Sequence, residues 1–157
     1  MEYITNSEIE TEKIACELAK KLKTKKVVAL SGDLGSGKTI FVKGLACGLG
    51  IKTVITSPTF VFIKEYPIQK IQNPKLKIQT KPKFQISKLI HVDCYRVKSE
   101  KDAEAIGLID YLNQKNNIIA IEWPENIESI LPKNIVKVNF ENMGKNIRKI
   151  TINLDNI

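Results

Sequence analysis

The stretch VVALSGDLGSGKT, residues 27–39, decides the fold of this chain. It joins an apolar run to the pattern G-x-x-x-x-G-K-[ST], which reads here Gly32-Asp33-Leu34-Gly35-Ser36-Gly37-Lys38-Thr39. The apolar run predicts a buried strand over residues 26–30, and the pattern after it predicts a helix over about residues 37–50. A glycine-rich turn between a strand and a helix forms a phosphate-binding loop, because its N–H groups point inward at the positive end of the helix dipole.

The residues of this loop have expected roles toward a nucleotide. Lys38 is expected to bring a positive charge to the β- and γ-phosphates, and the Thr39 hydroxyl is expected to be a ligand for Mg²⁺. The neighbouring positions surround the phosphates. The predicted nucleotide contacts in this segment are Gly32, Asp33, Leu34, Gly35, Ser36, Gly37, Lys38, Thr39 and Ile40.

Two acidic residues are expected to complete the site, since each ends an apolar strand candidate. Asp93 ends LIHVD and Glu122 ends IIAIE, and in parallel strands both carboxylates reach the sheet edge that carries the loop. One acid is expected to bind Mg²⁺ and the other to position or activate the attacking water, and the sequence leaves open which does which. The predicted catalytic residues are Asp93, Lys38 and Glu122, and the predicted metal ligands are Thr39, Glu122 and Asp93. His91 is interpreted as structural or as a support for a site residue.

The pattern of the whole chain predicts an α/β fold, a P-loop NTPase-type three-layer sandwich with a mixed central β-sheet. Ser7 is a plausible N-cap for the first helix. Helices are expected over residues 7–23, 37–50 and 100–113, with a short helix or turn over 124–131. Strands are expected over residues 26–30, 61–66, 88–93, 117–122, 135–140 and 149–154. Residues 1–157 are expected to form a single domain, with a lysine-rich hairpin or loop excursion at about 66–88.

Composition narrows the class of protein. The net charge of +8 permits an anionic partner, and residues 64–88 hold seven lysines against one acid, which indicates a solvated loop or a surface near RNA phosphates. No apolar run is long enough to span a bilayer and no signal peptide is recognisable, so a cytoplasmic protein without a membrane is expected. Cys16 and Cys47 lie among apolar helical residues and are expected to be small core side chains, and a disulfide framework is not expected.

The motifs favour ATP over GTP and leave three functions open. No Asp-x-x-Gly follows Asp93 and no Asn-Lys-x-Asp occurs, as a GTPase would require. The first hypothesis is an accessory ATPase. The second is a small-molecule kinase, although the excursion offers lysines rather than the arginines of a phosphate-covering lid. The third is an ATP-sensing interaction module that hydrolyses little.

Several short motifs follow one another along the chain. They are the loop at residues 32–39, SPTF at 57–60, HVDCYR at 91–96, EAIG at 104–107 followed by Asp110-Tyr111, and EWPE at 122–125. In this order they resemble the TsaE (YjeE) family of P-loop ATPases, which serve the biosynthesis of tRNA N6-threonylcarbamoyladenosine. The segment at 66–88 is longer than the short hairpin typical of the family.

The resemblance implies ATP and Mg²⁺ as cofactors and several further roles. Glu122 would be a magnesium ligand, Asp93 the acid needed for hydrolysis, and residues 57–60 a switch-like segment. Ser7 and Arg148 would border the nucleotide. The partners would be the TsaD and TsaB subunits of the threonylcarbamoyl transferase complex, with tRNA reached indirectly, and ATP hydrolysis would reset that complex between turnovers.

Overall fold

The computed structural model describes residues 1–22, 27–68, 86–114 and 116–154, and it arranges them around one mixed sheet. The strands are β1 (Glu2–Thr5), β2 (Val27–Gly32), β3 (Ile63–Pro67), β4 (Lys88–Asp93), β5 (Asn117–Glu122), β6 (Val136–Gly144) and β7 (Ile147–Leu154). The helices are α1 (Glu8–Lys21), α2 (Lys38–Gly48), α3 (Glu100–Ala105), α4 (Leu108–Asn113) and the 3₁₀ helix η1 (Pro124–Ile130).

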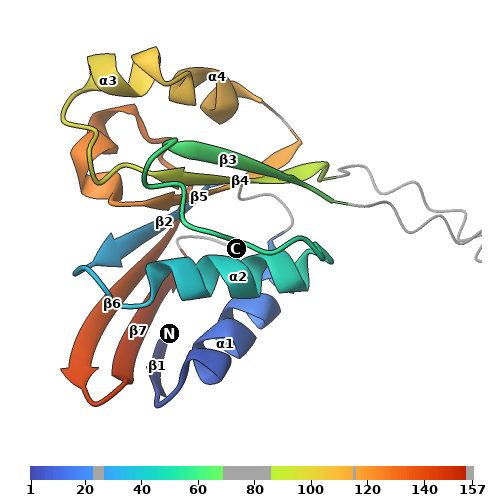
Figure 1. Cartoon of the computed structure of the whole chain (residues 1–157), viewed down its shortest axis with the longest axis vertical. Helices are drawn as coiled ribbons and strands as arrows, with labels where there is room; N and C mark the ends of the chain where they lie inside the picture. Colours follow the sequence, from blue (N-terminus) through green and yellow to red (C-terminus); the bar gives the residue numbers. More distant parts are fainter. Residues whose placement is uncertain (23–26, 69–85, 115, 155–157) are drawn as a thin grey trace, which may run out of the picture.

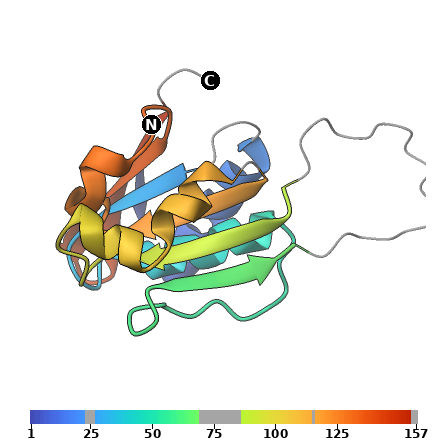
Figure 2. The same cartoon turned by 90° about the horizontal axis from the view of Figure 1, so that it is seen from above.

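The seven strands lie in the order β1-β7-β6-β2-β5-β4-β3. The four central strands, β6, β2, β5 and β4, run parallel, whereas β3, β7 and β1 pair antiparallel with their neighbours. Helices α1 and α2 cover one face of the sheet, and α3, α4 and η1 cover the other (Figures 1 and 2). The predicted α/β fold with a mixed sheet is therefore confirmed.

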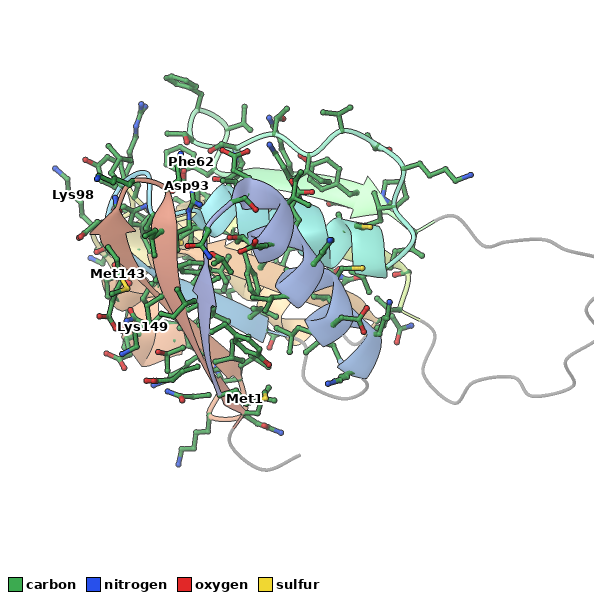
Figure 3. All side chains as sticks on the ribbon, turned by 90° about the horizontal axis from the view of Figure 1, so that it is seen from below. Met1, Phe62, Asp93, Lys98, Met143 and Lys149 are labelled. Carbon is green, nitrogen blue, oxygen red and sulfur yellow. The ribbon has the colours of Figure 1, made fainter. Side chains whose placement is uncertain are left out.

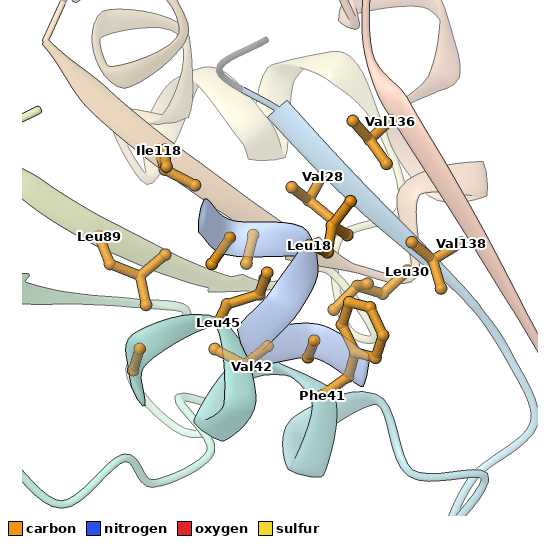
Figure 4. Packing of buried hydrophobic residues seen from close by; sticks show 14 of the residues in the cluster. Leu18, Val28, Leu30, Phe41, Val42, Leu45, Leu89, Ile118, Val136 and Val138 are labelled. Atoms are coloured by element: carbon orange, nitrogen blue, oxygen red, sulfur yellow. The ribbon is translucent and has the colours of Figure 1, made fainter. Parts of the chain in front are cut away.

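Alternation along the central strands divides the apolar core into two layers. On β2, Val28 and Leu30 face α1 and α2, whereas Val27 and Ala29 face α3, α4 and η1. The first layer contains Phe41 of α2, which is fully buried against the strands (Figure 4). Because both faces of the parallel strands are covered, their sequences read as continuous apolar runs rather than as alternating ones.

The structure differs from the predicted elements at two places. The strand β1 was not predicted; it pairs with β7, and its four residues are too few and too mixed in polarity for a clear pattern. The single helix predicted over residues 100–113 is two short helices, because Gly107 adopts φ +76° and interrupts the backbone between α3 and α4.

Helices α1 and α2 approach each other closely because α2 places two glycines against α1. A Cβ atom on Gly44 would lie 2.3 Å from the Glu12 carbonyl oxygen, and one on Gly48 would lie 2.4 Å from the Cys16 carbonyl oxygen. The backbones of the two helices are therefore in direct contact, and the helices lie side by side on this side of the sheet (Figure 1).

The expectation that Cys16 and Cys47 are core side chains is wrong. Cys47 is exposed and Cys16 is half-buried, whereas Cys94 is buried. The apolar face of α2 is occupied by larger side chains such as Phe41 and Leu45, so the cysteine in its last turn faces outward.

The lysine-rich excursion predicted at 66–88 lies mostly outside the described residues, which resume at residue 86. Its two ends are seen as the last residues of β3 and the first residues of β4. Among the helices of the described ranges, none combines the length and the apolar character needed to cross a membrane.

Candidate active site

A cleft of about 390 Å³ lies at the carboxyl ends of the parallel strands β2, β4 and β5. The residues that line it are Glu8, Leu34, Gly35, Ser36, Gly37, Lys38, Thr39, Ile40, Ser57, Thr59, Asp93, Tyr95, Glu122, Trp123 and Arg148. Asp93 lies beside Phe62 at the end of the sheet opposite Met1 (Figure 3), and the Asp93 N–H donates a hydrogen bond to the Phe62 carbonyl. The topology thus gathers most of the predicted site residues from four separate parts of the sequence, whereas Ser7, Gly32 and Asp33 are not among the residues that line the cleft.

Lys38 is held inside the glycine-rich loop. Its Nζ donates to the carbonyl oxygens of Gly32 at 2.6 Å and Asp33 at 2.8 Å, and it lies 4.0 Å from the centre of the Trp123 ring. The side chain is buried, and this desolvation lowers the pKa of Lys38 below 10.5, although the nearby carboxylates, Glu122 first, oppose the shift. The ammonium group is therefore already stripped of most water and positioned by the backbone.

Glu122 and Thr39 form the next part of the site. The Thr39 hydroxyl donates to Glu122 Oε1 at 2.8 Å, and His91 Nε2 lies 2.8 Å from the same oxygen. His91 and Glu122 are both buried, so the histidine holds the carboxylate away from bulk solvent and in a fixed orientation. His91 is thus a support for a site residue, which is one of the two roles that the sequence suggested.

Asp93 is bound by a different set of groups. Its Oδ2 accepts from the Thr59 hydroxyl at 2.7 Å, and its Oδ1 accepts from the Tyr95 backbone N–H at 3.0 Å. The Ser57 and Thr59 hydroxyls lie 2.6 Å apart, so the segment at 57–60 is connected to this carboxylate. The two acids consequently have different partners: Glu122 contacts Thr39 after the glycine-rich loop, and Asp93 contacts the segment at 57–60.

Arg148 and the start of α1 border the same cleft. Arg148 comes from β7 and packs on Gly37, where a Cβ atom would lie only 2.9 Å from its Nε. Gly37 has φ +107° and precedes the first residue of α2, so a side chain there would be strained by its backbone conformation and would displace Arg148. Ser7 is the N-cap of α1 and accepts from the Glu10 N–H, and the adjacent Glu8 lines the cleft.

The donor atoms fit a nucleotide with a hard cation. The Ser36 hydroxyl is buried in the loop without a hydrogen-bond partner, which is costly unless a ligand oxygen meets it. Thr39 and Glu122 offer oxygen atoms, the ligands that Mg²⁺ prefers. Within the described part of the chain, no three His, Cys, Asp or Glu side chains group to hold a metal on their own. The oxygen atoms of Thr39 and Glu122 would fit Mg²⁺ as two of its ligands.

Sequence reasoning did not identify the roles of Glu8, Tyr95 and Trp123 in this cleft. Trp123 adopts φ +60°, which turns its ring back over the Lys38 ammonium and within 5.0 Å of the Tyr95 ring, centre to centre. Such a position depends on a rare backbone conformation after β5, and only the Glu122-Trp123 adjacency in the sequence hinted at it.

Comparisons with known proteins identify relatives of this chain. The family model described as "Threonylcarbamoyl adenosine biosynthesis protein TsaE" matches residues 5–150. The chain is 37% identical over 153 residues to the tRNA threonylcarbamoyladenosine biosynthesis protein TsaE of Aquifex aeolicus, covering 96% of this chain and 94% of the relative. It is 36% identical over 142 residues to the protein of the same name from Bacillus subtilis, covering 90% of this chain and 78% of the relative.

A solved structure gives the same result for the fold. The crystal structure of YdiB from Bacillus subtilis superposes with a TM-score of 0.70 at 31% sequence identity, covering 97% of this chain and 83% of that chain. The match by the family model includes the glycine-rich loop, both acids and Arg148. The chain therefore belongs to the TsaE family of tRNA threonylcarbamoyladenosine biosynthesis proteins.

Proposed function

We propose that this protein is a cytoplasmic ATPase that binds ATP with Mg²⁺ and serves the threonylcarbamoylation of tRNA adenosine 37. It acts together with the TsaB and TsaD subunits, and ATP hydrolysis resets their complex between turnovers. The observation that carries the proposal is the convergence of Lys38, Thr39, Glu122 and Asp93 on one cleft at the carboxyl ends of parallel strands.

Binding of the phosphates follows from the loop. The Lys38 ammonium exchanges the Gly32 and Asp33 carbonyls for β- and γ-phosphate oxygens, and the buried Ser36 hydroxyl gains a partner. The N-terminus of α2, which begins at Lys38, adds its partial positive charge. Arg148, packed on Gly37, supplies a second cation at the edge of the cleft.

The two acids divide the remaining work. Thr39 and Glu122 would hold Mg²⁺, with Glu122 fixed by His91, and the metal would supply neutralisation of the negative charge of the phosphates. Asp93 orients the attacking water and accepts its proton, because it accepts from Thr59, whereas Glu122 accepts from Thr39.

Dependence on partner proteins is supported by exposed apolar side chains in and next to the cleft. Leu34 and Tyr95 line the cleft and are 78% and 52% exposed, and Phe60, which follows the lining residue Thr59, is 82% exposed. Exposed aromatic and aliphatic residues of this size, next to a reactive site, favour a surface that a partner covers. TsaD and TsaB are the partners proposed for it, and contact with tRNA is made through them.

The test is phosphate release from Mg-ATP by the wild type, Lys38→Ala and Lys43→Ala, each with and without TsaB, TsaD and tRNA. Lys43 is an exposed lysine on the same helix and is the matched control. We expect release by the wild type and by Lys43→Ala to rise with the partners, and Lys38→Ala to neither bind nor hydrolyse ATP. Wild-type binding by Lys38→Ala would refute the phosphate role of the loop.

Two other outcomes decide against hydrolysis for the complex. Tight ATP binding without phosphate release, even with all partners present, identifies an ATP-sensing module. Transfer of the γ-phosphate to a small acceptor in place of water identifies a kinase. Both outcomes remove Asp93 from the role of water-orienting base.

A further inference from the structure

Two cysteine thiols meet across the interface between α1 and α2, away from the cleft. The Cys16 thiol, in the third turn of α1, donates to the Cys47 sulfur, in the last turn of α2, at an Sγ–Sγ distance of 3.8 Å. Cys47 is exposed and Cys16 is half-buried, so reagents in solution reach the pair. Nothing in the proposed ATPase function uses either thiol.

The packing of the two helices favours a covalent link at this point. Gly48 follows Cys47 directly and lies against the Cys16 carbonyl, where a Cβ atom would be 2.4 Å from the oxygen. The backbones that carry the two thiols are therefore already in contact. The sulfurs must close from 3.8 Å to the bonded distance of about 2.0 Å, and the helices that carry them are already packed against each other.

We propose that Cys16 and Cys47 form a redox-responsive dithiol site, which a low-molecular-weight disulfide such as oxidised glutathione converts to an intramolecular disulfide between α1 and α2. The proposal rests on the juxtaposition, the exposure and the helix contact, and it is independent of nucleotide binding.

The chemistry proceeds in two exchange steps. The Cys47 thiol loses its proton to solvent, and the thiolate attacks one sulfur of the disulfide, forming a mixed disulfide and releasing one glutathione thiolate. The Cys16 thiolate then attacks Cys47 Sγ, forming the Cys16–Cys47 bond and releasing the second glutathione thiolate. Two protein thiols are oxidised, one disulfide is reduced to two thiols, and the two protons balance the two leaving groups.

The environment of the thiols sets this order. Burial, followed by the neighbouring Cys47, raises the pKa of Cys16, so the exposed Cys47 is the first to attack. Cys94 does not compete, since burial raises its pKa to about 12 and its side chain is inaccessible. The bond closes a segment that contains β2 and the whole glycine-rich loop, and it therefore restricts the unfolded chain.

The test equilibrates the full chain with oxidised glutathione and measures intact mass and melting temperature. For the wild type we expect the loss of two hydrogens without a retained glutathione, and a melting temperature raised by about 5–10 °C that a reductant reverses. The Cys16→Ser variant is expected to keep one glutathione on Cys47, because the resolving thiol is missing. The Cys47→Ser variant is expected to remain largely unmodified.

Three results would overturn the proposal. The first is a wild type that retains glutathione on Cys47 as persistently as Cys16→Ser does. The second is a disulfide-linked dimer in place of the monomer with two fewer hydrogens. The third is a disulfide that peptide mapping assigns to Cys94. Serine replaces cysteine with little change in volume. A melting curve of each variant that matches that of the wild type under reducing conditions therefore shows that the variant is folded.

Discussion

Replacing each acid of the cleft by its amide separates a water-orienting role from a metal-binding role. In Asp93→Asn the side-chain oxygen still accepts from the Tyr95 N–H, and the new amide donates to the Thr59 hydroxyl, so both present contacts keep a partner. In Glu122→Gln the side-chain oxygen still accepts from Thr39. Each variant thus changes the charge and leaves the shape nearly constant.

The magnitudes follow from these positions. Loss of a general base slows the chemical step by about 10²–10⁴-fold, which corresponds to about 2.7–5.4 kcal/mol of activation free energy. The single-turnover rate of Asp93→Asn is therefore expected to fall by about 10²–10⁴-fold, whereas its affinity for Mg-ATP is expected to stay within about threefold of the wild type. Glu122 lies on Thr39, the proposed magnesium ligand. Glu122→Gln is therefore expected to weaken magnesium-dependent ATP binding by about 10–100-fold.

The assay combines two measurements on each variant. Magnesium titrations at a fixed concentration of a fluorescent ATP analogue give the affinity, and rapid-quench phosphate release at saturating nucleotide gives the rate. Asp110→Asn, an exposed acid on α4, is the matched control and is expected to behave as the wild type. The reasoning is refuted if Asp93→Asn loses binding while keeping its rate at saturation, since Asp93 would then be the metal ligand.

Three further predictions follow from the geometry. Gly37→Ala is expected to abolish ATP binding, because the added methyl group displaces Arg148. Gly50 also has a positive φ, +75°, but open space around it, so Gly50→Ala is expected to cost only about 1–2 kcal/mol of unfolding free energy. Equal ATP affinities of the two variants in isothermal titration would contradict this difference. Burial lowers the pKa of Lys38, so the folded protein releases that proton at a lower pH than the unfolded chain does. The wild type should therefore gain stability relative to Lys38→Met as the pH rises toward 10.5. A difference in melting temperature between the two proteins that stays constant over this pH range would contradict the prediction. Phe41→Ala should lower the unfolding free energy by about 3–5 kcal/mol in urea titrations, and a loss below about 1 kcal/mol would mean that the core layer under α2 is loosely packed.

The parts of the fold that were predicted are those in which a local pattern determines the element. The strands β2, β4 and β5 are buried on both faces, so each appears in the sequence as a continuous apolar run. Such a run can be recognised as a strand without knowing which strands it pairs with. The strand β1 depends instead on pairing with β7 from the far end of the chain, and only Thr5 of its four residues is buried. The break at Gly107 was missed because a glycine is tolerated inside a helical pattern.

The candidate site divides in the same way. The loop and the two acids were predicted because each is marked by a motif or by a strand end. Their partners were not, because contacts such as that of Thr59 with Asp93 join segments that the sequence does not relate. The cysteines were misjudged for a related reason: which face of α2 meets the sheet is decided by larger side chains, and the outward position of Cys47 follows from theirs.

The position of β1 in the sheet affects when a newly synthesised chain can complete its fold. Its only sheet neighbour is β7, and the Met1 ammonium donates to the Ile152 carbonyl, so among the described strands the first one synthesised waits for the last. The cleft is subject to the same delay, because Arg148 must arrive from β7 before Gly37 is covered. A nascent chain on the ribosome therefore has its glycine-rich loop long before the cleft is finished, and the cleft is complete only after β7 has been synthesised.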